Sequence, residues 1–255
     1  MLRAAARLGW GLAALVLSAG PARAYIDPAD VILERAAARR ARLGFSTVVL
    51  EGRLVEAAPS SGHPALALGP SPDGEGPVAV WTALAADQAI RTEVRHPDRT
   101  EVTLLRGRDR FDFVVGRGAS VPERRAAAPF LELLGSREPD PRGRRGLALL
   151  ARMGIDATVV RLALHAGRPT YVIGAEPSDI GTPQLRVDKE LLTPVLWRDA
   201  EGREVRLSGY HLPTTGPWFP ERVERLVGGR TERVVIYERA RLNVPIVEGT
   251  FAPPR

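Results

Sequence analysis

Histidines are the first side chains to consider for metal or acid–base chemistry, and this chain has four of them. They are His63, His96, His165 and His211, and none has a second histidine four residues away. The chain has no cysteine, so thiolate ligands, disulfides and cysteine nucleophiles are all excluded. The histidine spacing therefore predicts no metal site, and no cofactor is expected.

Serine, glycine and acidic residues form no catalytic motif either. Three serines are considered as nucleophiles, Ser46, Ser178 and Ser208, and none of them lies in a Gly-x-Ser-x-Gly elbow. Gly116-Arg-Gly118 is too short to cradle a phosphate. Asp188 and Glu190 form a charged turn, which we interpret as a solvated hairpin tip. These patterns predict that the protein is not an enzyme.

The composition fits one folded domain that does not bind nucleic acid. The chain has 255 residues, of which 44% are hydrophobic, and this is enough for one sizeable core. Its formal charge is +6, but three arginines and no acidic residue lie within the first 24 residues. No basic helix or basic run interleaved with aromatic residues follows, which disfavours nucleic acid as a partner.

Residues 1–24 have the three-part pattern of a secretory signal peptide. A charged start with two arginines is followed by an apolar segment over residues 8–19 and by the small-x-small site Ala22-Arg-Ala24. The apolar segment is short for a membrane span, although a retained N-terminal anchor is an alternative. We expect cleavage before Tyr25 and a soluble exported protein in which residues 25–255 form a single domain.

The C-terminal half of the chain reads as a run of strands between residues 158 and 237. In residues 160–165, valine and leucine alternate with Arg161, Ala163 and His165, which is the period-two pattern of a half-buried strand. Further strands are expected at residues 170–174, 184–188, 191–197, 203–210, 218–227 and 234–237. The connections are too short for a helical crossover, so the pattern predicts an antiparallel sheet.

The N-terminal half mixes helices and strands. We expect a helix capped by Asp27, with Pro28 at its first position and Gly44 at its end. Ser120 begins a capping-box pattern that predicts a helix ending at Gly135. The other elements expected are strands at residues 45–55, 78–84, 90–95 and 101–115, a surface loop at residues 59–76, and a helix at residues 144–153.

Several phrases of the sequence carry a resemblance to a known family. They are Tyr171-Val-Ile-Gly174, Pro183-Gln-Leu-Arg-Val-Asp-Lys-Glu190, Trp218-Phe-Pro-Glu-Arg222 and Asn243-Val-Pro-Ile246. Together with the exported helix–strand start, they resemble the bacterial periplasmic lipoprotein-carrier superfamily, the LolA/LolB-like outer-membrane lipoprotein-sorting proteins. The resemblance covers nearly all of residues 25–255 and includes no catalytic signature.

This resemblance implies an α+β fold, in which a strongly curved antiparallel β-sheet forms an incomplete barrel covered by a few α-helices. Members of the superfamily hold acyl chains in an apolar concave space, and a related module serves in envelope-stress sensing. The resemblance also implies a periplasmic location in a Gram-negative-type envelope. Arg91 is the nearest match to the carriers' functional arginine. The long loop at residues 59–76 departs from the family pattern.

Large apolar side chains are the candidates for lining a lipid cavity. They are Trp81, Phe111, Phe113, Phe130, Leu134, Val160, Leu162, Leu164, Trp197, Tyr210, Trp218 and Phe219, with Arg91 as the candidate polar contact. Each acyl methylene moved from water into such a cavity contributes about 0.8 kcal/mol. The alternative for each side chain is ordinary core packing between sheet and helices. Trp218 and Phe219 are neighbours, so on a strand they would point to opposite faces.

We therefore expect a protein that binds lipid or lipoprotein acyl chains and carries them between the two envelope membranes. The alternative is a non-enzymatic envelope-stress sensor or regulatory module that uses the same fold to bind a protein partner, such as an envelope membrane protein. Uptake of a fluorescent fatty acid would favour the carrier, and co-purification with a membrane partner would favour the regulator. The sequence leaves the cargo and the oligomeric state open.

Overall fold

The computed structural model describes residues 26–43, 45–56, 78–85, 89–126, 140–211 and 219–252. Within these ranges the helical elements are α1 (Ala29–Ala41), a 3-10 turn η1 (Pro141–Gly143) and α3 (Arg144–Arg152). The strands are β1 (Thr47–Glu56), β2 (Val78–Ala85), β3 (Ile90–Arg95), β4 (Arg99–Arg106), β5 (Asp109–Gly116), β6 (Glu123–Ala126), β7 (Val160–His165), β8 (Arg168–Ile173), β9 (Gln184–Asp188), β10 (Pro194–Arg198), β11 (Arg203–Ser208), β12 (Arg222–Val227) and β13 (Arg230–Leu242).

All strands of the described residues belong to one sheet, in the order β6-β5-β4-β3-β2-β1-β13-β12-β11-β10-β9-β8-β7. Every neighbouring pair is antiparallel, as short connections require. The first and last strands of the sequence pair at the centre, with Val48 opposite Leu242 and Val55 opposite Val234. The sheet therefore consists of two meanders, β1–β6 and β7–β13, which are joined by the pairing of β1 with β13.

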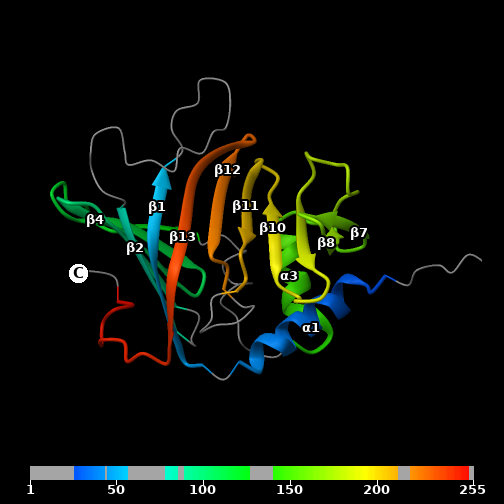
Figure 1. Ribbon diagram of the computed structural model, residues 1–255, viewed down its shortest axis with the longest axis horizontal. Coiled ribbons are helices and arrows are strands. Elements are labelled where there is room, and N and C mark those ends of the chain that lie inside the picture. The colour runs from blue at the N-terminus through cyan, green and yellow to red at the C-terminus, as the bar shows by residue number, and fades with distance from the viewer. Residues whose placement is uncertain are drawn as a thin grey trace, which may run out of the picture.

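The sheet bends strongly, so β1, β2 and β4 lie on one side of the molecule and β8 and β10 on the other (Figure 1). Within the described residues β6 and β7 each have only one neighbouring strand, so the sheet does not close. These findings confirm an α+β fold with a strongly curved, incomplete antiparallel barrel. The structure describes no helix that is long and apolar enough to cross a membrane.

Helix α3 begins at Arg144 as expected, whereas α1 differs from expectation at its N-terminal end. Pro28 is the N-cap of α1, and Asp27 does not cap the helix. Asp27 instead accepts hydrogen bonds from Arg35 Nη1 at 2.6 Å and from Tyr171 Oη at 2.9 Å, which fasten α1 to β8. At α3, Asp140 accepts from the backbone N–H groups of Arg145 and Gly146 and so satisfies two free donors of the helix start.

The helix expected to begin at Ser120 does not begin there. Glu123–Ala126 forms β6 and pairs with β5. Ser120 Oγ accepts a hydrogen bond from Val114 N–H across the preceding turn, so the hydroxyl is used by a β-turn rather than by a helix. The rest of that expected helix, the loop at residues 59–76, Gly44 and the signal segment lie outside the described residues.

The charged turn after β9 is also different from expectation. Asp188 is buried, with only 2% of its side chain exposed, whereas Glu190 is exposed. The carboxylate of Asp188 accepts from Arg168 Nε at 2.6 Å and from the N–H groups of Glu190 and Leu191 at 2.9 and 2.8 Å. Burial alone would raise the pKa of Asp188, but these hydrogen bonds outweigh it and the pKa lies below its usual value.

Ladder partners share a face of a sheet, so each face can be followed from strand to strand. We call the face that α1 and α3 cover the inner face, and the opposite face the outer face. The largest apolar cluster lies on the inner face and joins Ile32, Leu33, Leu149 and Leu150 of the helices to Tyr171, Ile173, Leu185, Val187, Trp197 and Leu207 of the strands. This cluster is the main core of the protein.

Candidate binding surfaces

The inner face of strands β7–β11 is filled by helix packing. Trp197 and Tyr210 are 6% and 9% exposed and belong to the main core, and Val160 and Leu162 pack against it. Tyr210 Oη donates a hydrogen bond to the carbonyl of Pro194, and burial raises the pKa of this phenol. Four of the sequence-predicted cavity residues therefore contact α1 and α3 or the residues that pack against them.

The inner face continues onto the N-terminal half of the sheet. Leu207, Val223, Val235 and Leu54 are successive ladder partners on β11, β12, β13 and β1, so they form one apolar row across the centre. Beyond this row lie further buried side chains: Val48, Leu50, Val80, Ile90, Val94 and Leu105. None of the described apolar clusters of this half contains a residue of α1 or α3. We call this surface the inner wall.

Three hydroxyl groups interrupt the apolar inner wall. Thr82 Oγ1 lies 3.2 Å from Thr92 Oγ1 and 3.1 Å from Tyr237 Oη, which brings β2, β3 and β13 together. Burial raises the pKa of Tyr237, and the hydrogen bond with Thr82 offsets part of this effect. Among the described residues these two hydrogen bonds engage two of the three hydroxyl protons, which leaves one O–H without a described acceptor.

Arg91 lies on the outer face and fastens the C-terminal segment of residues 243–252. Its Nη1 donates to the carbonyl of Thr250 at 3.0 Å and its Nε to Glu93 at 2.8 Å. The guanidinium carbon is 5.9 Å from the centre of the Phe113 ring, within cation–π range. Phe251 packs on this surface with Phe111 and Phe113. These sequence-predicted residues thus lie on the opposite side of the sheet from α1 and α3.

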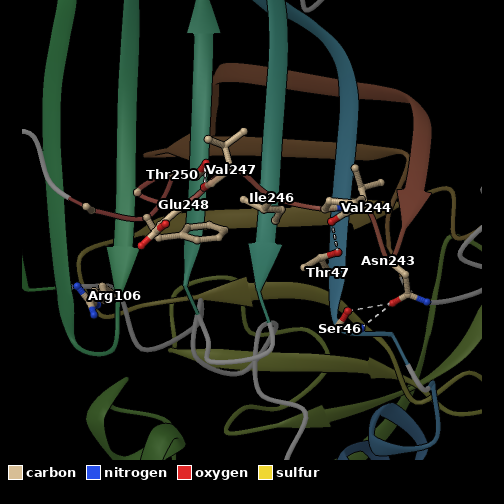
Figure 2. A pocket seen from close by; sticks show the side chains of 13 residues that line it. Ser46, Thr47, Arg106, Asn243, Val244, Ile246, Val247, Glu248 and Thr250 are labelled. Carbon is tan, nitrogen blue, oxygen red and sulfur yellow. Dashed lines mark hydrogen bonds between the residues drawn. The ribbon is translucent and has the colours of Figure 1, made fainter.

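A pocket of about 530 Å³ lies between the C-terminal segment and the start of β1. In Figure 2 the segment runs from Asn243, beside Ser46, toward Arg106 at the end of β4. Asn243 Oδ1 accepts from Ser46 N–H at 2.7 Å, and Thr47 Oγ1 donates to the carbonyl of Val244 at 2.7 Å. The pocket is lined both by polar groups and by the apolar residues Val244, Ile246 and Phe251.

The remaining candidates are spread over other parts of the chain. Leu164 is 71% exposed at the end of β7. The Phe219 ring lies 5.8 Å from that of Phe45, in a cluster with Val48 and Leu50. Trp81 lies on β2, where its ladder partners are Glu51 and Glu93. The other three candidates, Phe130, Leu134 and Trp218, lie outside the described residues. The candidates therefore do not form one site.

Sequence reasoning missed the hydroxyl group and the pocket, for different reasons. Thr82, Thr92 and Tyr237 come from three strands, and only the strand register brings them together. The pocket had a visible signal, because Asn243 and Pro245 follow directly after the last strand and break its pattern. The same phrase carries the family resemblance, and its proline also indicates that the chain leaves the sheet after β13.

The histidines that the structure describes do not gather. His96 Nε2 lies 3.2 Å from Glu101 Oε1, and His211 Nε2 lies 3.7 Å from Glu221 Oε2. Burial and the nearby charges of Arg186 and Arg206 hold the pKa of His165 below its usual value. Among the described residues no group of three or more histidine or acidic side chains is placed to hold a metal ion.

We compared the sequence and the fold of this chain with those of known proteins. No family model and no curated protein matches the sequence. A LolA superfamily protein from Nitrosomonas europaea aligns with a TM-score of 0.50 and 16% identity over 89% of this chain and 98% of that chain. A DUF1329 family protein from Desulfovibrio piger aligns with a TM-score of 0.51 and 13% identity over the same shares. At such identities the likeness shows the fold, which is LolA-like.

Proposed function

We propose that this protein is exported to the periplasm and binds the acyl chains of lipids or lipoproteins on its inner wall. The observation that carries the proposal is the division of the inner face. Its C-terminal half is filled by α1 and α3, while the apolar clusters that the described residues form in its N-terminal half include no residue of these helices. The LolA-like fold supports the same role, because the sequence phrases also resemble the lipoprotein-carrier superfamily.

The chemistry of the inner wall suits a lipid. Leu54, Val80 and Val94 form a buried apolar cluster, and an acyl chain that reached it would gain about 0.8 kcal/mol for each methylene removed from water. The hydroxyls of Thr82, Thr92 and Tyr237 lie beside this cluster and offer a donor to an ester or carboxylate oxygen. Acyl-chain binding needs no catalytic group, and the role we propose is therefore carriage and not catalysis.

The test uses two threonines that match in burial but face opposite ways. Thr92 on β3 faces the inner wall and Thr100 on β4 faces outward, and both are half-buried. Thr92→Phe places a bulky ring where the acyl chain would lie, so fluorescent fatty-acid affinity should fall at least tenfold. Thr100→Phe should leave the affinity unchanged. No binding by the unmodified protein at any chain length, or equal losses in both variants, would overturn the proposal.

Export is tested separately. The signal pattern of residues 1–24 predicts that protein recovered from the periplasm begins at Tyr25. Intact-mass measurement of the periplasmic protein reads this directly. Recovery of the full-length chain from the membrane fraction would contradict export as a free carrier and would favour a retained anchor.

A regulatory module is the second candidate, and the outer pocket is the observation in its favour. The pocket is open on the face opposite the inner wall, and Val247, which lines it, is 80% exposed, as a docking surface for a protein segment would be. A regulator should co-purify with an envelope membrane protein, and Val247→Arg should abolish that capture. A carrier should retain fatty-acid uptake in the same variant.

A further inference from the structure

The two edges of the sheet are protected very differently. β6 has four residues, and three of them are Glu123, Arg124 and Arg125, whose charges discourage another strand from pairing there. β7 has six residues, of which Arg161 is the only permanent charge. Its Leu164 is 71% exposed, among the most exposed large apolar side chains of the described residues. Within the part of the chain that the structure describes, β7 is therefore an edge strand without these protections (Figure 1).

The hairpin geometry fixes which backbone groups of β7 point away from the sheet. Ala166 and Gly167 both have positive φ, 48° and 78°, as in a two-residue type I′ turn. His165 and Arg168 flank this turn and form a hydrogen-bonded pair, so alternate residues back to Val159 bond toward β8. The N–H and C=O groups of Leu162 and Leu164 consequently point outward.

We propose that β7 pairs antiparallel with β7 of a second copy across a two-fold axis, which joins two sheets edge to edge. Centred on Leu162, this pairing places Leu162 opposite its own copy and Leu164 opposite Val160. Cross-strand apolar pairs of this kind stabilise antiparallel sheets, and the exposed Leu164 gains a cover. Arg161 lies opposite Ala163, so the two Arg161 side chains are diagonal neighbours and are not directly opposed.

The choice of a second copy follows from this self-complementarity. The carbonyl of Val160 accepts a hydrogen bond from Arg161 Nη1 at 3.0 Å. Arg161 also pairs with Glu176 through Nη2 at 2.7 Å, so its guanidinium keeps a partner when the carbonyl of Val160 bonds to the pairing strand instead. A head-to-tail contact between β7 and β6 of the next copy would set Arg161 against the arginines of β6 and would grow into an open fibre. Pairing of β7 with itself closes after two chains.

The first test measures mass in solution for the full chain and two variants. By light scattering coupled to size exclusion, the unmodified protein should give twice the mass of one chain at high concentration. Leu164→Arg and Leu164→Pro should each give a single chain, because one adds a charge and the other removes an outward N–H without removing a bond to β8. Val121→Arg changes an 86% exposed valine before β6 and should stay dimeric.

The second test reads the register through a single introduced cysteine, since the chain has none. Leu162→Cys should form an intermolecular disulfide on mild oxidation, because the two copies of this residue face each other within disulfide range. Leu164→Cys should not, because its two copies lie about 13 Å apart along the strands, although this side chain is more exposed. A monomer at every concentration, a dimer that survives both Leu164 variants, or efficient cross-linking only through Leu164→Cys would overturn the proposal.

Discussion

At the scale of single residues, position in the ladder decides role more than residue type does. Asp188 and Glu190 look alike in the sequence as parts of one charged turn, yet one is buried and the other is exposed. Arg91 is an arginine among many, but it holds the C-terminal segment through the carbonyl of Thr250. Neither role is visible in composition or spacing, because each depends on a partner from another strand or segment.

The Asp188 cluster gives a prediction about stability and pH. Asp188→Asn weakens a charge-assisted hydrogen bond from Arg168 in a buried place, so the free energy of unfolding should fall by about 1.5–3 kcal/mol at pH 7. Glu190→Gln changes an exposed partner of the same arginine and should cost roughly 0.5 kcal/mol or less. Denaturant unfolding monitored by circular dichroism measures both variants.

The pH dependence of the same pair has a definite sign. The folded-state pKa of Asp188 is depressed, so its contribution to stability is present above the unfolded-state pKa of about 4 and is lost as pH falls through the folded-state value. The difference between the unmodified protein and Asp188→Asn should therefore shrink on acidification below about pH 4. A difference that stays constant down to pH 2 would show that the charge of Asp188 is not the cause.

At the scale of elements, the strands were predictable where hairpins are tight. The expected strands at residues 90–95 and 203–210 match β3 and β11 closely, because short turns and alternation leave little freedom. The helix expected after Ser120 failed at its start for a physical reason. A Ser-x-x-Glu pattern satisfies a helix start or a β-turn equally well, and here pairing of β6 with β5 decides the outcome.

The placement of the cavity candidates could not be predicted at this scale either. Leu162 and Phe113 both alternate correctly within their strands, but alternation says only that neighbours face opposite ways. Which face becomes the inner one depends on where α1 and α3 pack, and that is settled by contacts far apart in the sequence. Leu162 thus packs against the main core, while Phe113 lies on the outer face beneath Phe251.

Strand β13 contains a bulge at Glu238, and the residue of β1 that lies opposite it must be glycine. The register with β13 shifts between Glu51 and Gly52, and a β-carbon at Gly52 would lie 2.0 Å from the carbonyl oxygen of Ile236. Gly52→Ala should therefore lower the free energy of unfolding by roughly 2–3 kcal/mol. Gly181→Ala is the matched control, since a β-carbon there meets nothing closer than 3.7 Å. Equal, small effects in thermal unfolding would show that the bulge relaxes without cost.

At the scale of the whole molecule, the curved sheet separates three regions that a ligand could affect. The inner face of β7–β11 is occupied by α1 and α3, the inner wall belongs to β1–β4 and β13, and the outer pocket lies under residues 243–252. Because β1 pairs with β13 at the centre, the inner wall combines strands from both ends of the sequence. The site can therefore be located by asking which strands a ligand protects.

Hydrogen–deuterium exchange with and without a long-chain fatty acid makes this distinction. Amides open locally with free energies set by the packing around them, and a ligand raises those energies only where it contacts the folded chain. We expect slower exchange in β1, β2, β3 and β13 and no change in β8–β10, whose inner face is already covered by helices. In Thr92→Phe the fatty acid should no longer slow exchange, whereas in Thr100→Phe it should. Slower exchange confined to residues 243–252 would move the binding site to the outer pocket and contradict the inner wall.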